Sequence, residues 1–209
     1  VGSYAINQGT LGNSNYAITY VSANETIGAR QITVTADTPA SRHYGDANPA
    51  LTYTIGGLGL VNGDSLAGAL ATSATSASGV GSYAITQGSL GNPNYQITGF
   101  TAANLSVTAR PITVTADAQT RHYGDANPTL TYTVGGLGMA NGDTLGGALA
   151  TSATTASGVG SYSITAGTLG DPNYQITTFT SASLSVTARP ITVTADAKSR
   201  IYGDANPVL

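Results

Sequence analysis

Cysteine is absent from this chain of 209 residues, and tryptophan, lysine and charged side chains in general are rare or missing. Without cysteine, disulfides, thiolate metal sites and thiol nucleophiles are excluded. Charged residues make up 8% of the chain and the formal net charge is −3. We therefore expect no nucleic-acid partner, since that class binds through clustered basic residues. No apolar run approaches twenty residues, so we also expect no insertion into a membrane.

Small and turn-forming residues take the place of the missing types. The chain has 27 glycines, and threonine, valine, serine, alanine and asparagine fill most of the rest, while long helix formers are scarce. Threonine and valine favour strands, and glycine, asparagine and proline favour turns. This composition predicts an all-β protein with many tight turns.

The sequence repeats itself every 79 residues. The stretch RHYGDANP at 42–49 returns at 121–128 and, as RIYGDANP, at 200–207. His43, His122 and Ile201 occupy the same place (122 − 43 = 79 and 201 − 122 = 79). The repeat predicts four parts, in the manner of a tandem array cut from a longer one. These are residues 1–31 as the C-terminal part of a preceding repeat, 32–110 and 111–189 as complete repeats, and 190–209 as the N-terminal part of a following repeat.

Within one repeat, alternation of apolar and polar residues predicts several short strands. They cover residues 31–37, 50–57, 82–88, 94–100 and 104–109. Asp64 is expected to cap one helical turn over residues 65–70, with Leu66 and Leu70 facing inward. Many short strands with frequent turns favour an immunoglobulin-like sandwich. A β-grasp-like sheet with one short helix is the alternative.

The repeated motif lies between the first two strands of a repeat and is interpreted as a structural turn. Its members are Tyr44, Gly45, Asp46, Asn48 and Pro49, and in the second copy Tyr123, Gly124, Asp125, Asn127 and Pro128. Glycine supplies a backbone conformation that side chains resist, Asp and Asn hold the turn through backbone amides, and Pro prevents strand pairing. The tyrosine ring is expected at the edge of the core with its hydroxyl in water. Since tryptophan is missing, the tyrosines are expected to supply most of the core volume.

Consecutive repeats are joined by only two residues, Arg110–Pro111 and Arg189–Pro190. Proline fixes its own φ and forces the preceding arginine into an extended conformation. This junction predicts stiff end-to-end connection, which requires the first and last strands of a repeat to run parallel. Ion pairs of Asp37 with Arg42 and of Asp117 with Arg121 are also expected near each turn.

Catalytic chemistry has little support in the sequence. The two histidines, His43 and His122, have Ile201 at the third equivalent position, which a general base would not tolerate. Asp46 and Asn48 lack the remaining oxygen ligands of a calcium loop. The sequence therefore predicts no catalytic residue, no cofactor and no metal site, and the protein is not expected to be an enzyme.

The ordered motifs ITVTAD, YGDANP, NGD, GSYxIT, NYQIT and LSVTAR resemble the MBG-type (YGX-type) repeats of large bacterial adhesins. The resemblance covers both complete repeats and both partial ones. It implies an extracellular or cell-surface stalk, often in proteins exported by two-partner secretion, with relatives that bind exopolysaccharide or host glycans in biofilms.

Two functions follow as hypotheses. The first is a spacer in an adhesin or matrix fibre, whose partners are neighbouring repeats of the same chain, with lateral self-association left open. The second is a repeated carbohydrate-binding module, in which exposed tyrosines and asparagines bind a polysaccharide weakly at many sites.

Overall fold

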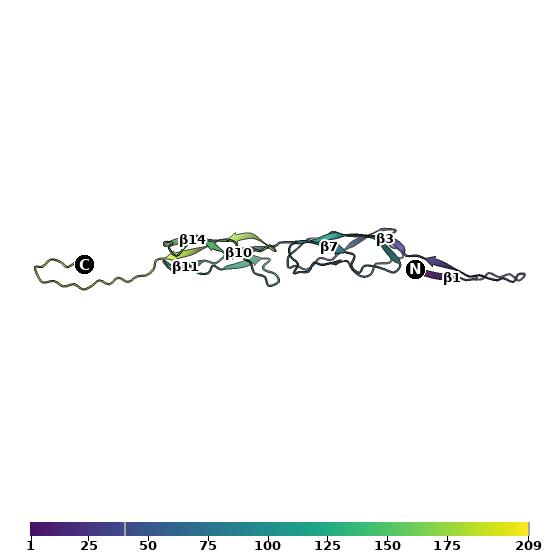
Figure 1. Cartoon of the computed structure of the whole chain (residues 1–209), viewed down its shortest axis with the longest axis horizontal. Helices are drawn as coiled ribbons and strands as arrows, with labels where there is room; N and C mark the ends of the chain where they lie inside the picture. The colour runs from purple at the N-terminus through teal and green to yellow at the C-terminus, as the bar shows by residue number, and fades with distance from the viewer. Residues whose placement is uncertain (40, 209) are drawn as a thin grey trace. The chain divides into compact units, whose positions relative to one another are not determined.

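The computed structural model describes residues 1–39 and 41–208, and these form strands, turns and loops without a helix. The predicted all-β class is therefore confirmed (Figure 1). Among the described residues, none forms a helix that could cross a membrane. The strands are β1 Gly2–Ile6, β2 Ala23–Ile27, β3 Arg30–Ala36, β4 Arg42–His43, β5 Tyr53–Gly57, β6 Ala71–Thr72, β7 Gly81–Thr86, β8 Tyr95–Thr101, β9 Ala103–Thr108, β10 Arg110–Ala116, β11 Gln119–His122, β12 Tyr132–Gly136, β13 Ala150–Thr151, β14 Gly160–Thr165, β15 Tyr174–Thr180 and β16 Ala182–Thr187.

The chain forms two compact units whose limits differ from those of the sequence repeats. Unit 1 consists of Val1–Pro111 together with the short segments Met139–Asp143 and Asp171–Gln175. Unit 2 holds the intervening segments and the chain from Ile176 onward. The limits given above for the four repeats remain a prediction.

Each complete repeat carries a pair of sheets. In the first repeat a three-stranded sheet has the order β5-β3-β8, and a four-stranded sheet has the order β4-β9-β7-β6. The second repeat has the same two orders, β12-β10-β15 and β11-β16-β14-β13. The N-terminal strands β1 and β2 form a separate antiparallel pair that corresponds to β7 and β9.

The first and last segments of a repeat run in the same direction. In the first repeat β3 pairs in parallel with β8, and β4 pairs in parallel with β9. The register places Arg30 beside Tyr95 at the start and His43 beside Thr108 at the end. The chain thus enters this repeat at one end and leaves it at the other, as the short junction requires.

The core of a repeat is aliphatic at its centre. Ile32 and Val34 of β3 and Ile85 of β7 are fully buried in one cluster, so the two sheets of the first repeat pack against each other. Tyr95 belongs to the same cluster at its margin, where its hydroxyl can reach polar partners. The expectation that tyrosines supply most of the core is therefore wrong: β-branched residues and leucine fill the space between sheets, and the tyrosines close its ends.

The helical turn expected over residues 65–70 is absent, and this expectation is wrong. Leu66 and Leu70 are buried as the spacing suggested, but Ala67 pairs with Gly91 through two antiparallel backbone hydrogen bonds of 2.8 and 2.9 Å. Gly68 also has φ +80°, which an α-helix does not accommodate. The β-grasp alternative needs this helix and therefore loses its support, and the immunoglobulin-like sandwich remains a prediction.

Residues 190–208 repeat the sequence of β3 and β4 without forming strands (Figure 1). In the complete repeats this segment lies between an antiparallel and a parallel neighbour, such as β5 and β8. Here Ile191 and Val193 are 80% and 84% exposed, because no such neighbours cover them among the described residues.

Candidate functional site

The repeated motif forms a tight turn directly after β4 and again after β11. Gly45 and Gly124 both have φ +86°, in the left-handed region that glycine enters without strain. The Asp46 amide donates to the carbonyl of His43 at 3.1 Å, and Asp125 does the same to His122. The turn brings the tyrosine and the aspartate of the motif to one end of the repeat.

A buried arginine fixes the far side of the turn. Arg42 is only 6% exposed, and its Nε donates to Asn48 Oδ1 at 2.8 Å. Its other nitrogens donate to the carbonyls of His43 and Thr75, while Asn48 Nδ2 donates to the Ala74 carbonyl at 2.7 Å. Arg121 and Asn127 repeat this network in the second repeat. Asn48 thus accepts from an arginine, where an Asx turn on a backbone amide was expected.

The aspartate of the motif pairs with the arginine of the junction. Arg110 Nη1 lies 2.7 Å from Asp46 Oδ1 and 3.2 Å from the carbonyl of Tyr44, to which it donates. Arg189 makes the same pair with Asp125. The expected pairs of Asp37 with Arg42 and Asp117 with Arg121 are therefore wrong, because the guanidinium groups of Arg42 and Arg121 point into the turn and bind amide and carbonyl oxygens.

Tyr44 is buried, at 6% exposure, and its hydroxyl donates to Asp143 Oδ2 at 2.8 Å within unit 1. Its ring meets that of Tyr174 edge to face, with ring centres 5.5 Å apart and planes at 79°. Tyr174 donates to the same Asp143 oxygen at 2.8 Å. The hydroxyl that we expected in water is thus held by a carboxylate.

These contacts change the acidity of both phenols. A hydrogen bond with Asn141 lowers the pKa of Tyr44, but the bond to Asp143 and burial raise it, and the net pKa lies above 10.0. Burial, and then the bond to Asp143, raise the pKa of Tyr174. The protonated phenols that donate to Asp143 are therefore the stable forms throughout the neutral range.

At the first junction, Arg110 and Pro111 lead directly from β9 into β10. The Arg110 amide donates to the carbonyl of Asn173 at 2.9 Å, within unit 1. β9 and β10 lie in different sheets and do not pair, so residues 105–115 form no hairpin. Pro111 lies in β10, whereas Arg189 and Pro190 follow β16 and are exposed.

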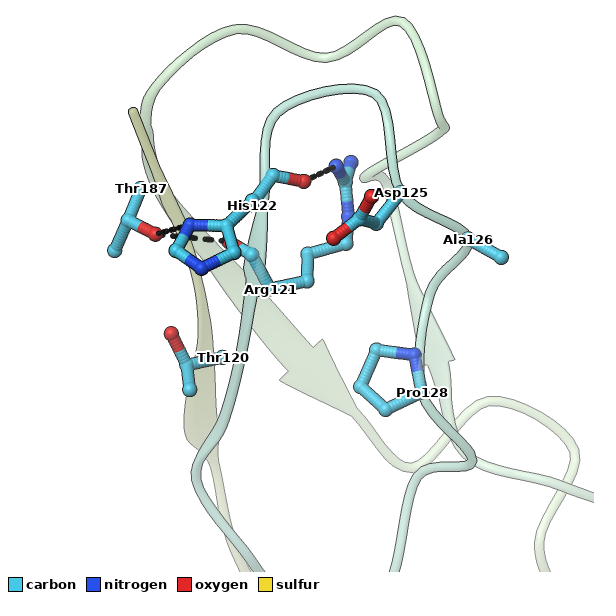
Figure 2. A pocket seen from close by; sticks show the side chains of 7 residues that line it. All are labelled: Thr120, Arg121, His122, Asp125, Ala126, Pro128 and Thr187. Carbon is cyan, nitrogen blue, oxygen red and sulfur yellow. Dashed lines mark hydrogen bonds between the residues drawn. The ribbon is translucent and has the colours of Figure 1, made fainter. Parts of the chain in front are cut away.

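In the second repeat the same turn borders an open cavity of ≈ 360 Å³. Figure 2 shows its lining, with the His122 ring beside Thr187 and Pro128 on the opposite side. The lining residues are Thr120, Arg121, His122, Asp125, Ala126, Pro128 and Thr187. His122 Nδ1 is engaged by Thr187 Oγ1 at 3.0 Å and the Ala188 carbonyl at 3.2 Å, so this nitrogen is occupied by structural contacts.

The comparisons with known proteins identify the family. The family model described as MBG domain (YGX type) matches residues 32–106 and 112–185. The chain belongs to the MBG domain family. Neither the curated proteins nor the solved structures gave a match. Domains of this family are structural rather than catalytic, and they typically occur in surface proteins.

The polar groups of these MBG domains are arranged for binding one another. No group of three or more potential metal-ligating His, Cys, Asp or Glu side chains occurs within residues 1–39 and 41–208. Asp143 accepts two phenols, and Asp46 faces a guanidinium. The arrangement therefore supports recognition of tyrosine and arginine side chains by carboxylates.

Sequence reasoning missed the importance of Arg42, Arg121 and Asp143. A signal for the two arginines was present, since an arginine opens every copy of the motif in a chain with only 8% charged residues. Asp143 lies in the NGD stretch of residues 141–143, one of the ordered motifs of the repeat. Its role as the acceptor of Tyr44 depends on contacts between segments 99 residues apart in sequence.

Proposed function

We propose that the MBG domains are spacer units in the stalk of an extracellular bacterial adhesin or matrix fibre. In this proposal stiff Arg-Pro junctions join them end to end, and the units extend a binding region or form the fibre itself. A location at the cell surface is supported by the places in which MBG domains typically occur. Export by two-partner secretion and a role in biofilms belong to the same proposal.

The observation that carries the proposal is the engagement of Tyr44. This tyrosine directly follows β4 of the first MBG domain, and its hydroxyl and ring contact Asp143 and Tyr174. Arg110 adds bonds to Asp46 and to the Asn173 carbonyl. Groups from three segments meet at this junction: the repeated motif, the NGD stretch at 141–143 and residues 173–174. Such a junction is suited to bearing load.

Small-angle X-ray scattering of the 209-residue chain tests this function. A spacer joined end to end should scatter as a rod, and the double variant Tyr44→Ala with Pro111→Gly should scatter as a more flexible chain. Two MBG domains that pack side by side would give a compact profile and contradict the proposal. Circular dichroism of both proteins controls for loss of folding.

The burial of tyrosine bears on carbohydrate binding, the alternative function. Tyr44, Tyr95 and Tyr174 are 6–7% exposed, so these three rings are not available as stacking platforms for sugars, whereas Tyr123 is 48% exposed. A glycan array probed with one and with two MBG domains distinguishes the functions. Binding that increases with the number of domains would favour the carbohydrate-binding module over the spacer.

The sandwich type is part of the proposal as well. In an immunoglobulin-like sandwich the first and last segments can each contribute to both sheets. Such sharing is supported here by β3 and β4 on one side and β8 and β9 on the other. An experimental structure of one MBG domain would test this assignment.

A further inference from the structure

Each complete repeat holds its first and last segments together along one line of contacts, which we call the parallel seam. In the first repeat the seam joins residues 30–46 to residues 94–110, with β3 parallel to β8 and β4 parallel to β9. In the second repeat it joins residues 112–125 to residues 176–189, where β11 pairs in parallel with β16 and β10 lies beside β15. The seam therefore uses both sheets of a repeat.

Threonine hydroxyls add bonds to the backbone pairing of the first seam. At the register shift that follows Ile32, Thr98 Oγ1 donates to the Ile32 carbonyl at 3.1 Å. Thr108 Oγ1 donates to the Arg42 carbonyl at 3.2 Å, and the Tyr44 amide donates to the Thr108 carbonyl at 2.9 Å. Each of these bonds crosses from the first segment of the repeat to the last.

The second repeat contains the same reinforcement. Thr177 Oγ1 donates to the Ile112 carbonyl at 3.0 Å, and Thr187 Oγ1 donates to the Arg121 carbonyl at 3.2 Å. Because the same hydroxyls bond to the same backbone positions in both complete repeats, the reinforcement belongs to the MBG domain itself.

An ion pair closes the exit end of each seam. Arg110 pairs with Asp46 and donates to the Tyr44 carbonyl, and Arg189 pairs with Asp125 in the second repeat. Both arginines immediately follow the last residues of the seam strands, so the ion pair also joins the last segment of a repeat to the first.

The direction of the strands decides how tension would act on a seam. The chain enters a repeat at the start of the first seam strand and leaves it after the last one, and these strands run in the same direction. Tension along the chain therefore pulls the two sides of the seam past each other. Since the bonds of a parallel pair are evenly spaced along it, they share the load and must break together. Peeling from one end would break them one at a time.

We propose that the parallel seam is the load-bearing element of each MBG domain and keeps the domain folded under tension along the chain. This inference rests on the proposed spacer function, in which neighbouring domains transmit tension. It assigns the threonines at 98, 108, 177 and 187 the task of raising the barrier to unfolding under load. Resistance to force depends on the rate of unfolding, so these bonds act on that rate.

Single-molecule force spectroscopy of the 209-residue chain, held at its two ends, tests the proposal. We expect two unfolding events with the same gain in length, one for each complete repeat. The double variant Thr108→Val with Thr187→Val removes one seam bond from each repeat. It should raise the unfolding rate at constant force by about fivefold, as expected for the loss of one hydrogen bond.

The matched control removes the same kind of bond outside the seam. Thr86 Oγ1 donates to the Ala71 carbonyl at 3.2 Å, and Thr165 Oγ1 donates to the Ala150 carbonyl at 3.3 Å. Thr86→Val with Thr165→Val should lower the melting temperature about as much as the seam variant does. It should leave the unfolding rate under force unchanged, because β6 and β13 are not loaded.

Pulling the first repeat in two directions gives the sharper result. The chain has no cysteine, so handles can be attached at introduced cysteines alone. Gln31→Cys with Ser106→Cys applies force along the seam, whereas Gln31→Cys with Gln96→Cys separates two residues that lie opposite each other at its start. All three positions are exposed. We expect a clearly lower unfolding force in the second geometry.

Equal unfolding forces in the two directions would overturn the proposal, and so would an equal effect of the seam and control variants on the rate under load. Either result would leave the spacer function standing if the chain scatters as a rod. A compact scattering profile combined with a direction-dependent force would instead contradict the spacer function and retain the seam. The two failures are therefore distinguishable.

Discussion

The tyrosines at positions 44 and 123 share their sequence neighbours and differ in their surroundings. Tyr44 is 6% exposed with its hydroxyl on Asp143, whereas Tyr123 is 48% exposed, and its hydroxyl has no described hydrogen-bond partner. Both turns have the same glycine φ of +86°. The turn therefore holds the tyrosine ring in the same place in both repeats. The residues that pack against the ring decide whether it is buried.

Tyr44→Phe should lower the melting temperature at neutral pH and flatten its dependence on pH above 10. The pKa of Tyr44 is raised in the folded protein, so its contribution is fully present below the unfolded pKa and is lost as the pH rises through the folded pKa. Thermal unfolding followed by circular dichroism from pH 8 to 12 measures this. Tyr123→Phe, the control, should follow the parent chain, and an equal effect of both changes would contradict the assigned role of Asp143.

At the scale of elements, the shortest strands depend on side-chain bonds. β4 comprises only Arg42 and His43, and its arginine ties the turn to the loop at Ala74 and Thr75 through Asn48 and a backbone carbonyl. A buried guanidinium with three oxygen acceptors is satisfied without a carboxylate. The hydrogen bonds of Arg42 and Asn48 therefore stabilise the short β4, which its two backbone pairs alone would hold only weakly.

Arg42→Met should destabilise the first repeat by about 2 kcal/mol or more, because the Asn48 oxygen loses its donor and three hydrogen bonds disappear. Methionine retains the apolar stem, so the loss reports on the polar head. Urea unfolding followed by circular dichroism measures the change. Lys198→Met, in an exposed segment, is the control and should leave the midpoint unchanged; an equal midpoint for Arg42→Met would show that the network contributes little.

At the scale of the whole molecule, few of the basic residues lie where a protease such as trypsin can reach them. Six arginines and one lysine occur in the chain, and Arg110 and Arg189 precede proline. Arg42 and Arg121 are buried in strands. Apart from Arg189, which precedes proline, Lys198 and Arg200 are the only basic residues among the described ones that are exposed and lie outside strands.

Limited trypsin digestion should therefore cut first after Lys198 and Arg200 and leave the preceding chain intact. Mass spectrometry of the time course identifies the cleavage sites. Lys198→Gln combined with Arg200→Gln should delay the first cut strongly. Early cleavage after Arg42 or Arg121 would contradict the burial described for these arginines.

The sequence by itself determined the period, the strand class and the family. A period of 79 residues and alternation around Ile32 and Val34 are local regularities, and each is readable without knowledge of distant contacts. The turn at Gly45 was also readable, because a positive φ selects glycine wherever it occurs. The same holds for the fully buried aliphatic positions of β3.

Only the tertiary structure decided the partners of polar side chains. Arg42 was assigned to nearby Asp37, but the fold brings Asn48 and Thr75 to its guanidinium. Leu66 and Leu70 suited a helical turn, yet the bridge between Ala67 and Gly91 satisfies the backbone differently. Asn48 is about as close to Arg42 in the sequence as Asp37 is, and Thr75 is 33 residues away. Spacing along the chain therefore does not determine which of several polar side chains or carbonyls the arginine contacts.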